Sequence, residues 1–150
     1  MRPLTSGERK LLENRLKRQY GVEKAFRGLT LIMAGQRRIR ACTRETYELS
    51  KKLKKVQQLG VYVAKLRDEE VILSIEGSQI LGDEIKSNII ELDEHEAVEW
   101  MKASPIKIKE KPKSRYVVAK HGKIYLGSGI VSRDGKIYPQ IAKWRRIPEY

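Results

Sequence analysis

Apolar residues recur along the chain with helical and strand-like periods, and these periods predict its elements. A stripe at i, i+4 and i+8 predicts a helix over residues 6–20, with a capping box formed by Thr5 and Glu8 and an end at Gly21. The segment GLTLIMAGQRRIRACT that follows contains two runs of β-branched and large apolar residues around a turn. A helix followed by a β-hairpin is therefore expected at the start of the chain.

A second helix and two more strands are predicted next. Thr43 caps a helix that runs to about Lys55, and LGVYVAKL and EVILSI predict two strands joined by an acidic turn. Four apolar residues of this helix are expected to be buried: Tyr47, Leu49, Leu53 and Val56. The order α-β-β-α-β-β indicates an N-terminal α/β unit with a mainly antiparallel sheet.

The pattern changes at residues 77–88, GSQILGDEIKSN, whose Gly, Ser, Asp and Asn content is typical of a connection. A short strand, NIIEL, then precedes a helix capped by Asp93 and Glu96, which is expected to bury three residues: Ala97, Trp100 and Met101. Short strands with glycine-containing turns make up the remainder, and Gly127–Gly129 is expected to form a bulge or a barrel corner.

These elements place the chain in the α+β class. Residues 1–84 are predicted to form an N-terminal α/β domain, and residues 85–150 a small β-barrel sealed by the helix. The 150 residues, 40% of them hydrophobic, suffice for one core or for two small cores packed together.

The net charge of +13 is distributed unevenly. Residues 1–60 hold 16 Lys/Arg and 5 Asp/Glu (+11), residues 61–100 hold 3 and 11 (−8), and residues 101–150 hold 13 and 3 (+10). Self-repulsion of this size favours an anionic partner. Positive charge at both ends of a folded chain indicates nucleic acid rather than a membrane surface, which would favour one basic amphipathic segment.

Residue types that support catalysis or metal binding are too scattered to predict such a site. Cys42, His95 and His121 share no metal-ligand spacing; Cys42 is expected to be a buried small hydrophobe and His95 a solvated side chain. No enzymatic activity and no cofactor are expected. A single cysteine, no apolar leader and no membrane-spanning run predict a cytoplasmic protein.

The segment KIKEKPKSR, residues 107–115, is the first candidate binding segment. Its cations occupy every second position, and in an extended chain they would form one row that follows a phosphate backbone. A solvated loop interrupted by Pro112 is the alternative. Lys107 and Lys109, nearest to the predicted helix, are the favoured residues of this row.

The C-terminal segment AKWRRIPEY is the second candidate. Three cations, Lys143, Arg145 and Arg146, surround Trp144 in this segment. Arg pairs with phosphate through two N–H groups and also stacks on bases. The Trp144 ring either stacks on a base or fills the core, and the core position is favoured. A bend near Trp144 is expected.

The layout NIIELDEHEAVEWMKASPI followed by RYVVAKHGKIYLGSGIV resembles a PUA domain, the RNA-binding module named from pseudouridine synthases and archaeosine transglycosylases. The resemblance covers roughly residues 86–150. PUA domains often carry a glycine after the helix, where this chain has Ala103. They generally hold RNA between the helix–strand loop and the closing strands. By position, the resemblance implies RNA contacts from Lys102, Ser104, Lys107, Lys143, Arg145 and Arg146.

The N-terminal half carries a second resemblance. The opening MRPLT is similar to the start of a eukaryotic and archaeal ribosome-biogenesis family, whose members join an N-terminal α/β domain to a C-terminal PUA domain and act on large-subunit precursor RNA. The segment VILSIEGSQILG, running into NIIELDEHEAVEWM, is similar to single PUA proteins of archaea and to PUA-like parts of archaeal RNA cytosine methyltransferases.

Charge and resemblance together predict a non-catalytic RNA-binding protein that acts in ribosome assembly or in rRNA or tRNA modification. It would dock RNA phosphates on a basic C-terminal surface. The alternative is a protein–protein adaptor or accessory subunit, whose acidic residues 61–100 recruit a basic partner such as a ribosomal protein or an RNA methyltransferase.

Overall fold

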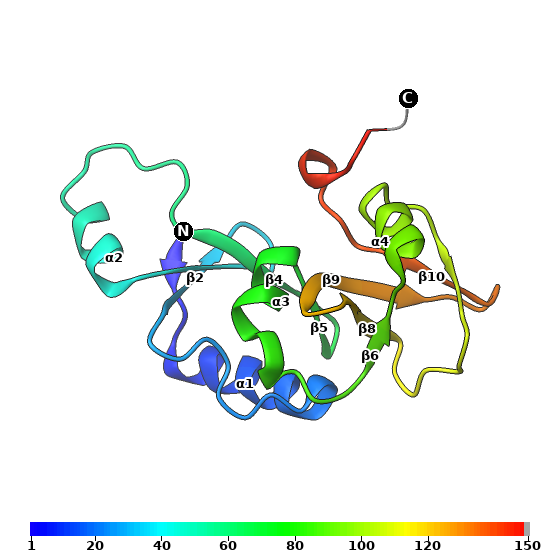
Figure 1. Ribbon diagram of the computed structural model, residues 1–150. Coiled ribbons are helices and arrows are strands. Elements are labelled where there is room, and N and C mark those ends of the chain that lie inside the picture. The colour runs from blue at the N-terminus through cyan, green and yellow to red at the C-terminus, as the bar shows by residue number, and fades with distance from the viewer. Residues whose placement is uncertain (149–150) are drawn as a thin grey trace.

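The computed structural model describes residues 1–148 and contains two five-stranded sheets (Figure 1). The first sheet has the order β1-β2-β3-β4-β5, and all of its pairs are antiparallel. The second has the order β6-β8-β9-β10-β7, with β6 parallel to β8 and the other pairs antiparallel. The predicted α+β class and the antiparallel N-terminal sheet are confirmed.

The first half of the chain contains β1 (Arg2–Pro3), α1 (Ser6–Tyr20), β2 (Thr30–Ala34), β3 (Arg38–Cys42), α2 (Arg44–Ser50), β4 (Val61–Arg67), β5 (Glu70–Leu73), α3 (Ile75–Leu81) and the 3-10 helix η1 (Gly82–Glu84). The second half contains β6 (Ile89–Glu91), α4 (Glu94–Met101), β7 (Ile106–Lys107), β8 (Tyr116–His121), β9 (Ile124–Val131), β10 (Lys136–Pro139) and the 3-10 helix η2 (Lys143–Arg145). The chain passes from the first sheet to the second after η1.

Helices α1 and α4 begin at the predicted capping boxes. The Thr5 hydroxyl accepts the Glu8 N–H at 3.1 Å, and the Glu8 carboxylate accepts the Thr5 N–H at 3.0 Å. Asp93 and Glu96 form the same reciprocal pair at the start of α4. These contacts satisfy backbone donors that have no partner within the helix, which explains why local sequence places both helix starts.

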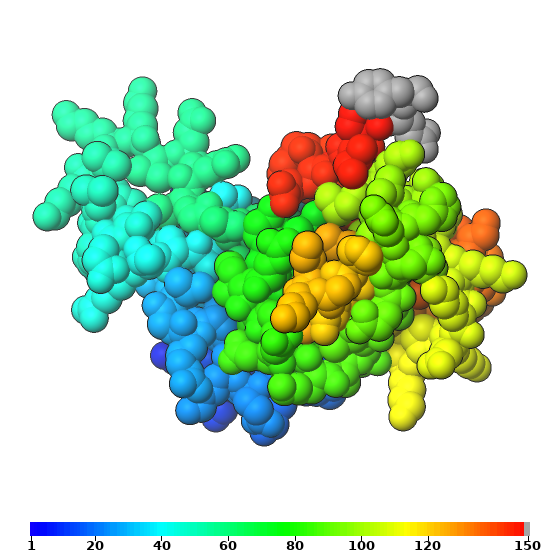
Figure 2. Space-filling model, in the orientation of Figure 1, coloured from blue at the N-terminus to red at the C-terminus, as the bar shows by residue number. Residues whose placement is uncertain are grey.

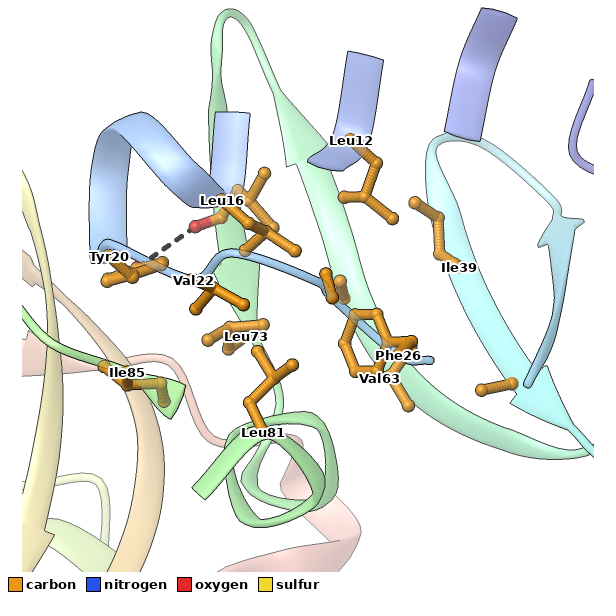
Figure 3. Packing of buried hydrophobic residues seen from close by; sticks show 14 of the residues in the cluster. Leu12, Leu16, Tyr20, Val22, Phe26, Ile39, Val63, Leu73, Leu81 and Ile85 are labelled. Carbon is orange, nitrogen blue, oxygen red and sulfur yellow. Dashed lines mark hydrogen bonds between the residues drawn. The ribbon is translucent and has the colours of Figure 1, made fainter. Parts of the chain in front are cut away.

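One face of the first sheet packs against α1. Figure 3 shows the apolar stripe of this helix beside Ile39 of β3 and Val63 of β4, all of them fully buried. Successive side chains of a strand point to opposite faces, so Arg38 and Arg40, on either side of Ile39, point away from this core. The face of the sheet opposite α1 is therefore cationic at β3.

A buried hydrogen-bond network joins the two sheets. The Gln19 side chain accepts the Val71 N–H at 2.8 Å and donates to the Val71 carbonyl at 3.0 Å. The Tyr20 and Ser128 hydroxyls lie 3.0 Å apart, and Ser128 also accepts the Leu73 N–H at 2.9 Å. Because unpaired buried polar groups are costly, these bonds fix β9 of the second sheet against β5 of the first.

Residues 77–88, where the sequence indicates a connection, include most of helix α3. The Ser74 hydroxyl accepts the Gly77 N–H at 2.9 Å and caps the helix. A Cβ atom at Gly77 would lie 1.9 Å from the Val63 carbonyl oxygen. Gly77 is therefore required for close approach of α3 to β4, whereas local sequence makes it resemble a turn residue.

The glycines of β9 form a bulge within one continuous strand rather than a turn between two. Gly127 has φ +81°, and the register shifts between Val118 and Lys120 on the neighbouring strand. A Cβ at Gly129 would lie 2.4 Å from the Trp100 ring, which is fully buried. The predicted bulge is confirmed, and Gly129 of this strand leaves space for the Trp100 ring of α4.

Residues 43–60, here called the arm, protrude from the body of the protein (Figure 1). Helix α2 ends at Ser50 instead of near Lys55, and the predicted burial of its apolar stripe is wrong. Leu49 and Leu53 are 58% and 56% exposed, and Tyr47 and Val56 are partly exposed. Lysines occupy four of the six positions 51–56, so desolvating this segment against the body would bury charge.

Beyond Lys107, the described residues of the two basic C-terminal segments form no strand. Strand β7 ends at Lys107, and residues 108–115 form a loop, so the predicted row of alternating cations is wrong beyond this point and the alternative holds. The predicted bend near Trp144 takes the form of the 3-10 helix η2. In a loop or a helical turn, alternate residues no longer share one side.

Cys42 and His95 lie as predicted. Cys42 is buried, which raises the pKa of its thiol, and His95 is exposed on α4. Within residues 1–148, no group of three or more His, Cys, Asp or Glu side chains is arranged to hold a metal ion. The described helices also include none with the length and apolar character needed to cross a membrane.

Candidate nucleic-acid interface

A groove of about 1440 Å³ lies between the first sheet and the C-terminal segment. One wall consists of the β2–β3 turn and strands β3 and β4, and the other of residues 140–142, 144 and 145, with residues 74–76 between them. Figure 2 shows a depression at the top of the view, with the arm on one side and η2 on the other. The two walls of the groove therefore come from segments about 70 to 110 positions apart in the sequence.

The groove has a strongly cationic lining. Among the described residues, six cationic side chains and one carboxylate, that of Glu76, line it. The six are Arg37, Arg38, Arg40, Lys65, Arg67 and Arg145. A concave surface lined by one sign of charge concentrates the potential and attracts anions, so a phosphate backbone is a matching ligand.

Strands β3 and β4 place like charges directly opposite each other. Arg38 pairs with Lys65 in the antiparallel register, and the Arg38 guanidinium lies 5.8 Å from the centre of the Tyr62 ring. Like charges directly opposite on one face destabilise a sheet unless an anion lies between them. Burial raises the pKa of the Tyr62 phenol, so this ring stays neutral at physiological pH.

Arg40 has a structural role within the groove. Its Nε donates to the Leu59 carbonyl at 2.9 Å, and its Nη2 donates to the Gly60 carbonyl. A Cβ at Gly60 would lie 2.3 Å from the Ala41 carbonyl oxygen, so glycine allows this close approach to β3. Arg40 thus fixes the end of the arm at the edge of the groove, and fewer of its N–H groups remain for a ligand.

Among the seven residues predicted to bind RNA, Arg145 lines the groove. Its Nε lies 2.8 Å from Oε1 of Glu76, and the two side chains are 43% and 33% exposed. Ion pairs with this exposure contribute little net free energy, so a phosphate can take the place of the carboxylate. Arg145 is therefore both a candidate phosphate contact and the link between η2 and α3.

Lys102, Ser104 and Arg146 lie where the end of α4 meets the C-terminal segment. The Ile147 N–H donates to the Met101 carbonyl at 2.9 Å and holds the two segments together. The Lys102 Nζ lies 3.7 Å from Oε1 of Glu99, and the Arg146 Nε donates to the Ile141 carbonyl at 3.1 Å. Ser104 is partly buried, and its N–H donates to the Glu99 carbonyl. These residues form a surface next to the groove.

Lys107, Lys109 and Lys143 are exposed but do not line the groove. The Lys109 Nζ lies 2.7 Å from Oε1 of Glu96, and the hydrogen bond between them raises the pKa of the Lys109 amine. Lys107 pairs with Lys136 across β7 and β10. Three of the seven predicted cationic or polar residues thus already have a carboxylate partner from the acidic middle of the chain, namely Lys102, Lys109 and Arg145.

Trp144 is 71% exposed and lines the groove, whereas Trp100 is fully buried. The core position favoured by the sequence for Trp144 is therefore wrong. The reason is the 3-10 turn: Ile141 enters the core, and the following residues turn outward at η2.

Sequence reasoning missed the cations of the N-terminal wall, Arg37, Arg38, Lys65 and Arg67. One signal pointed toward them, because residues 1–60 carry a net charge of +11. The alternation in RRIRAC also places Arg38 and Arg40 on one face of a strand. What local sequence does not contain is the pairing of β3 with β4 and the return of residues 140–145 to this face.

Replacing Glu76 with Gln should strengthen RNA binding severalfold and steepen its salt dependence by up to about one unit of log–log slope, because Arg145 becomes free to contact a phosphate. Glu13→Gln is the matched control, since it removes the same charge and breaks the Arg9–Glu13 ion pair on α1. Fluorescence anisotropy with labelled RNA at several salt concentrations measures both quantities. Identical affinities and slopes for the two variants would contradict the role given to Arg145.

No protein-family model matches the chain, and a search of curated proteins found no significantly similar sequence.

Proposed function

We propose that this protein is a non-catalytic RNA-binding protein that holds RNA phosphates in the groove between its first sheet and its C-terminal segment. The observation that carries the proposal is the composition of the groove lining. Among the described residues, this lining contains six cations, drawn from both halves of the chain, and one carboxylate. The surface beside the end of α4, with Lys102 and Arg146, extends the basic region beyond the groove.

The PUA resemblance supports RNA as the nucleic acid. A strand, a helix, a short loop and a second strand follow one another as β6, α4, residues 102–105 and β7, in the order that the resemblance implies. Ala103, at the position where PUA domains often carry glycine, has φ +64° in the left-handed region that favours glycine. We therefore propose a PUA-type barrel for residues 85–150, and a role in ribosome assembly or RNA modification.

The adaptor function has less support from the contacts of the acidic segment. Three carboxylates of residues 61–100 bind cations of the same chain: Glu76, Glu96 and Glu99. These groups are less available to a basic partner than the sequence suggests. A ribosomal protein or an RNA methyltransferase remains a candidate partner at surfaces outside the groove.

The direct test is the salt dependence of RNA binding by the intact protein. For about four or five phosphate contacts, the logarithm of the association constant should fall with a slope of about −3 to −4 against the logarithm of salt concentration. Fluorescence anisotropy with a labelled RNA, and with DNA of the same sequence as competitor, measures the slope and the preference for RNA. A slope shallower than about −1, or no binding at low salt, would exclude the proposed function.

A further inference from the structure

We infer that Trp144 is a base-stacking residue and that the groove selects RNA with an unpaired nucleotide beside the bound phosphates. This inference rests on the proposed function and names the chemical class of its ligand. An unpaired base has a free π-face, whereas a base within a duplex is covered by its neighbours.

Exposure of the ring is the first observation. Of the two tryptophans, one fills the core at Gly129 and the other has 71% of its surface exposed. Trp is a large aromatic side chain, and at this exposure its ring is accessible to a ligand base. Trp144 also lines the groove in which the cations gather.

The second observation is that the backbone holding the ring is fixed on both sides. Before it, Ile141 is buried and the Arg145 N–H donates to the Ala142 carbonyl at 2.8 Å. After it, the Ile147 N–H donates to the Met101 carbonyl at 2.9 Å. A ring carried on a fixed turn loses less conformational freedom on binding, which favours stacking.

The third observation is the arrangement of charge around the ring. Lys143 and Arg145 flank Trp144 in the sequence, and the opposite wall of the groove contains Arg37 and Arg38 beside the neutral Tyr62 ring. Alternating cations and aromatic rings are the pattern by which proteins bind single strands, since phosphates meet the cations and bases meet the rings. A protein partner would use the exposed ring without needing the facing cations.

The test compares two RNAs: a blunt hairpin, and the same hairpin with an unpaired extension of about six nucleotides. Trp144→Leu keeps an apolar side chain without a π-face, and Trp144→Phe keeps a smaller ring. Tyr138→Leu is the control, because it removes an exposed aromatic ring that does not line the groove. Melting followed by circular dichroism verifies that each variant is folded.

Wild type should bind the extended hairpin more tightly than the blunt one. Trp144→Leu should bind the extended hairpin roughly 5- to 150-fold more weakly than wild type does. Its affinity for the blunt hairpin should stay within about twofold of wild type, and its salt slope should be unchanged. Trp144→Phe should retain most of the affinity, and Tyr138→Leu should match wild type. The fluorescence of wild type should also be quenched by the extended hairpin, since Trp144 is the exposed tryptophan.

Two results would overturn the inference while leaving the proposed function intact. One is equal binding of both RNAs by wild type and Trp144→Leu with a steep salt slope. The other is an equal loss of affinity for both RNAs in Trp144→Leu. That result would make the ring a contact to the RNA backbone or a support of the groove. If wild type binds neither RNA, the proposed function fails and the inference fails with it.

Discussion

Replacing Arg37, Arg38 and Arg67 together with Gln should weaken RNA binding by about 100-fold at about 0.1 M salt and flatten the log–log salt slope by about two to three units. All three side chains are exposed on the N-terminal wall of the groove. Each lost phosphate contact removes about 0.7 to 0.9 from the slope, because fewer counterions are released on binding. Fluorescence anisotropy across a salt series measures both effects.

A matched triple variant separates the groove from the net charge. Arg27→Gln, Lys123→Gln and Arg133→Gln also remove three positive charges, from exposed positions that do not line the groove. Long-range attraction is screened beyond about 10 Å at about 0.1 M salt, so this control should change the affinity by less than about threefold. Equal losses in the two triple variants would show that RNA binding follows total charge and that the groove is not the site.

Replacing Gly77 with Ala should destabilise the protein by about 2 kcal/mol and lower Tm by roughly 4 to 8 °C. The added Cβ would lie 1.9 Å from the Val63 carbonyl oxygen, so α3 or β4 must shift. Alanine has the higher helix propensity by about 1 kcal/mol, and the steric term must exceed this gain. Calorimetry or circular dichroism melting measures the result.

Gly7→Ala is the control for this prediction. Gly7 also lies in a helix, α1, and the nearest heavy atom to an added Cβ is the Thr5 hydroxyl oxygen at 3.9 Å. Here the helix propensity of Ala acts without a clash, so Gly7→Ala should leave Tm unchanged or raise it. A Gly77→Ala variant as stable as Gly7→Ala would be incompatible with the close packing of α3 on β4.

Helix α3 connects stability to the groove. It carries Glu76, which binds Arg145, and its capping residue Ser74 lines the groove together with Ile75. The Ser74 hydroxyl also donates to the Tyr62 carbonyl at 2.6 Å. A shift of α3 therefore moves the residues between the two walls, so the geometry of the groove depends on a glycine that does not line it.

Elements defined by neighbouring residues could be predicted from the sequence. The capping boxes placed the starts of α1 and α4, and the turn around Gly35 placed the β2–β3 hairpin. Each of these features depends on side chains within a few positions of one another.

Elements defined by distant contacts could not be predicted in this way. The role of Gly77 depends on Val63, and strand β1 exists because Arg2 and Pro3 pair with β2. The apolar residues of the arm have helical spacing, but the fold places no element against them. An amphipathic pattern indicates that burial is possible and does not specify a partner surface.

The candidate site shows the same division. The sequence indicated an anionic partner and singled out the C-terminal cations, of which Arg145 lines the groove. It did not show that Glu76, Glu96 and Glu99 pair with those cations, or that β3 and β4 supply most of the free charge. The net charge of sequence segments indicates the sign of a partner's charge, whereas the location of the binding site depends on tertiary structure.

The most direct test of the groove as the RNA site is amide chemical-shift mapping by NMR with the intact protein and the extended hairpin. Residues 35–40, 60–67 and 140–146 should shift together during the titration, including the indole N–H of Trp144 but not that of buried Trp100. Shifts confined to residues 107–115 or to the outer face of α1, with the groove unchanged, would contradict the account.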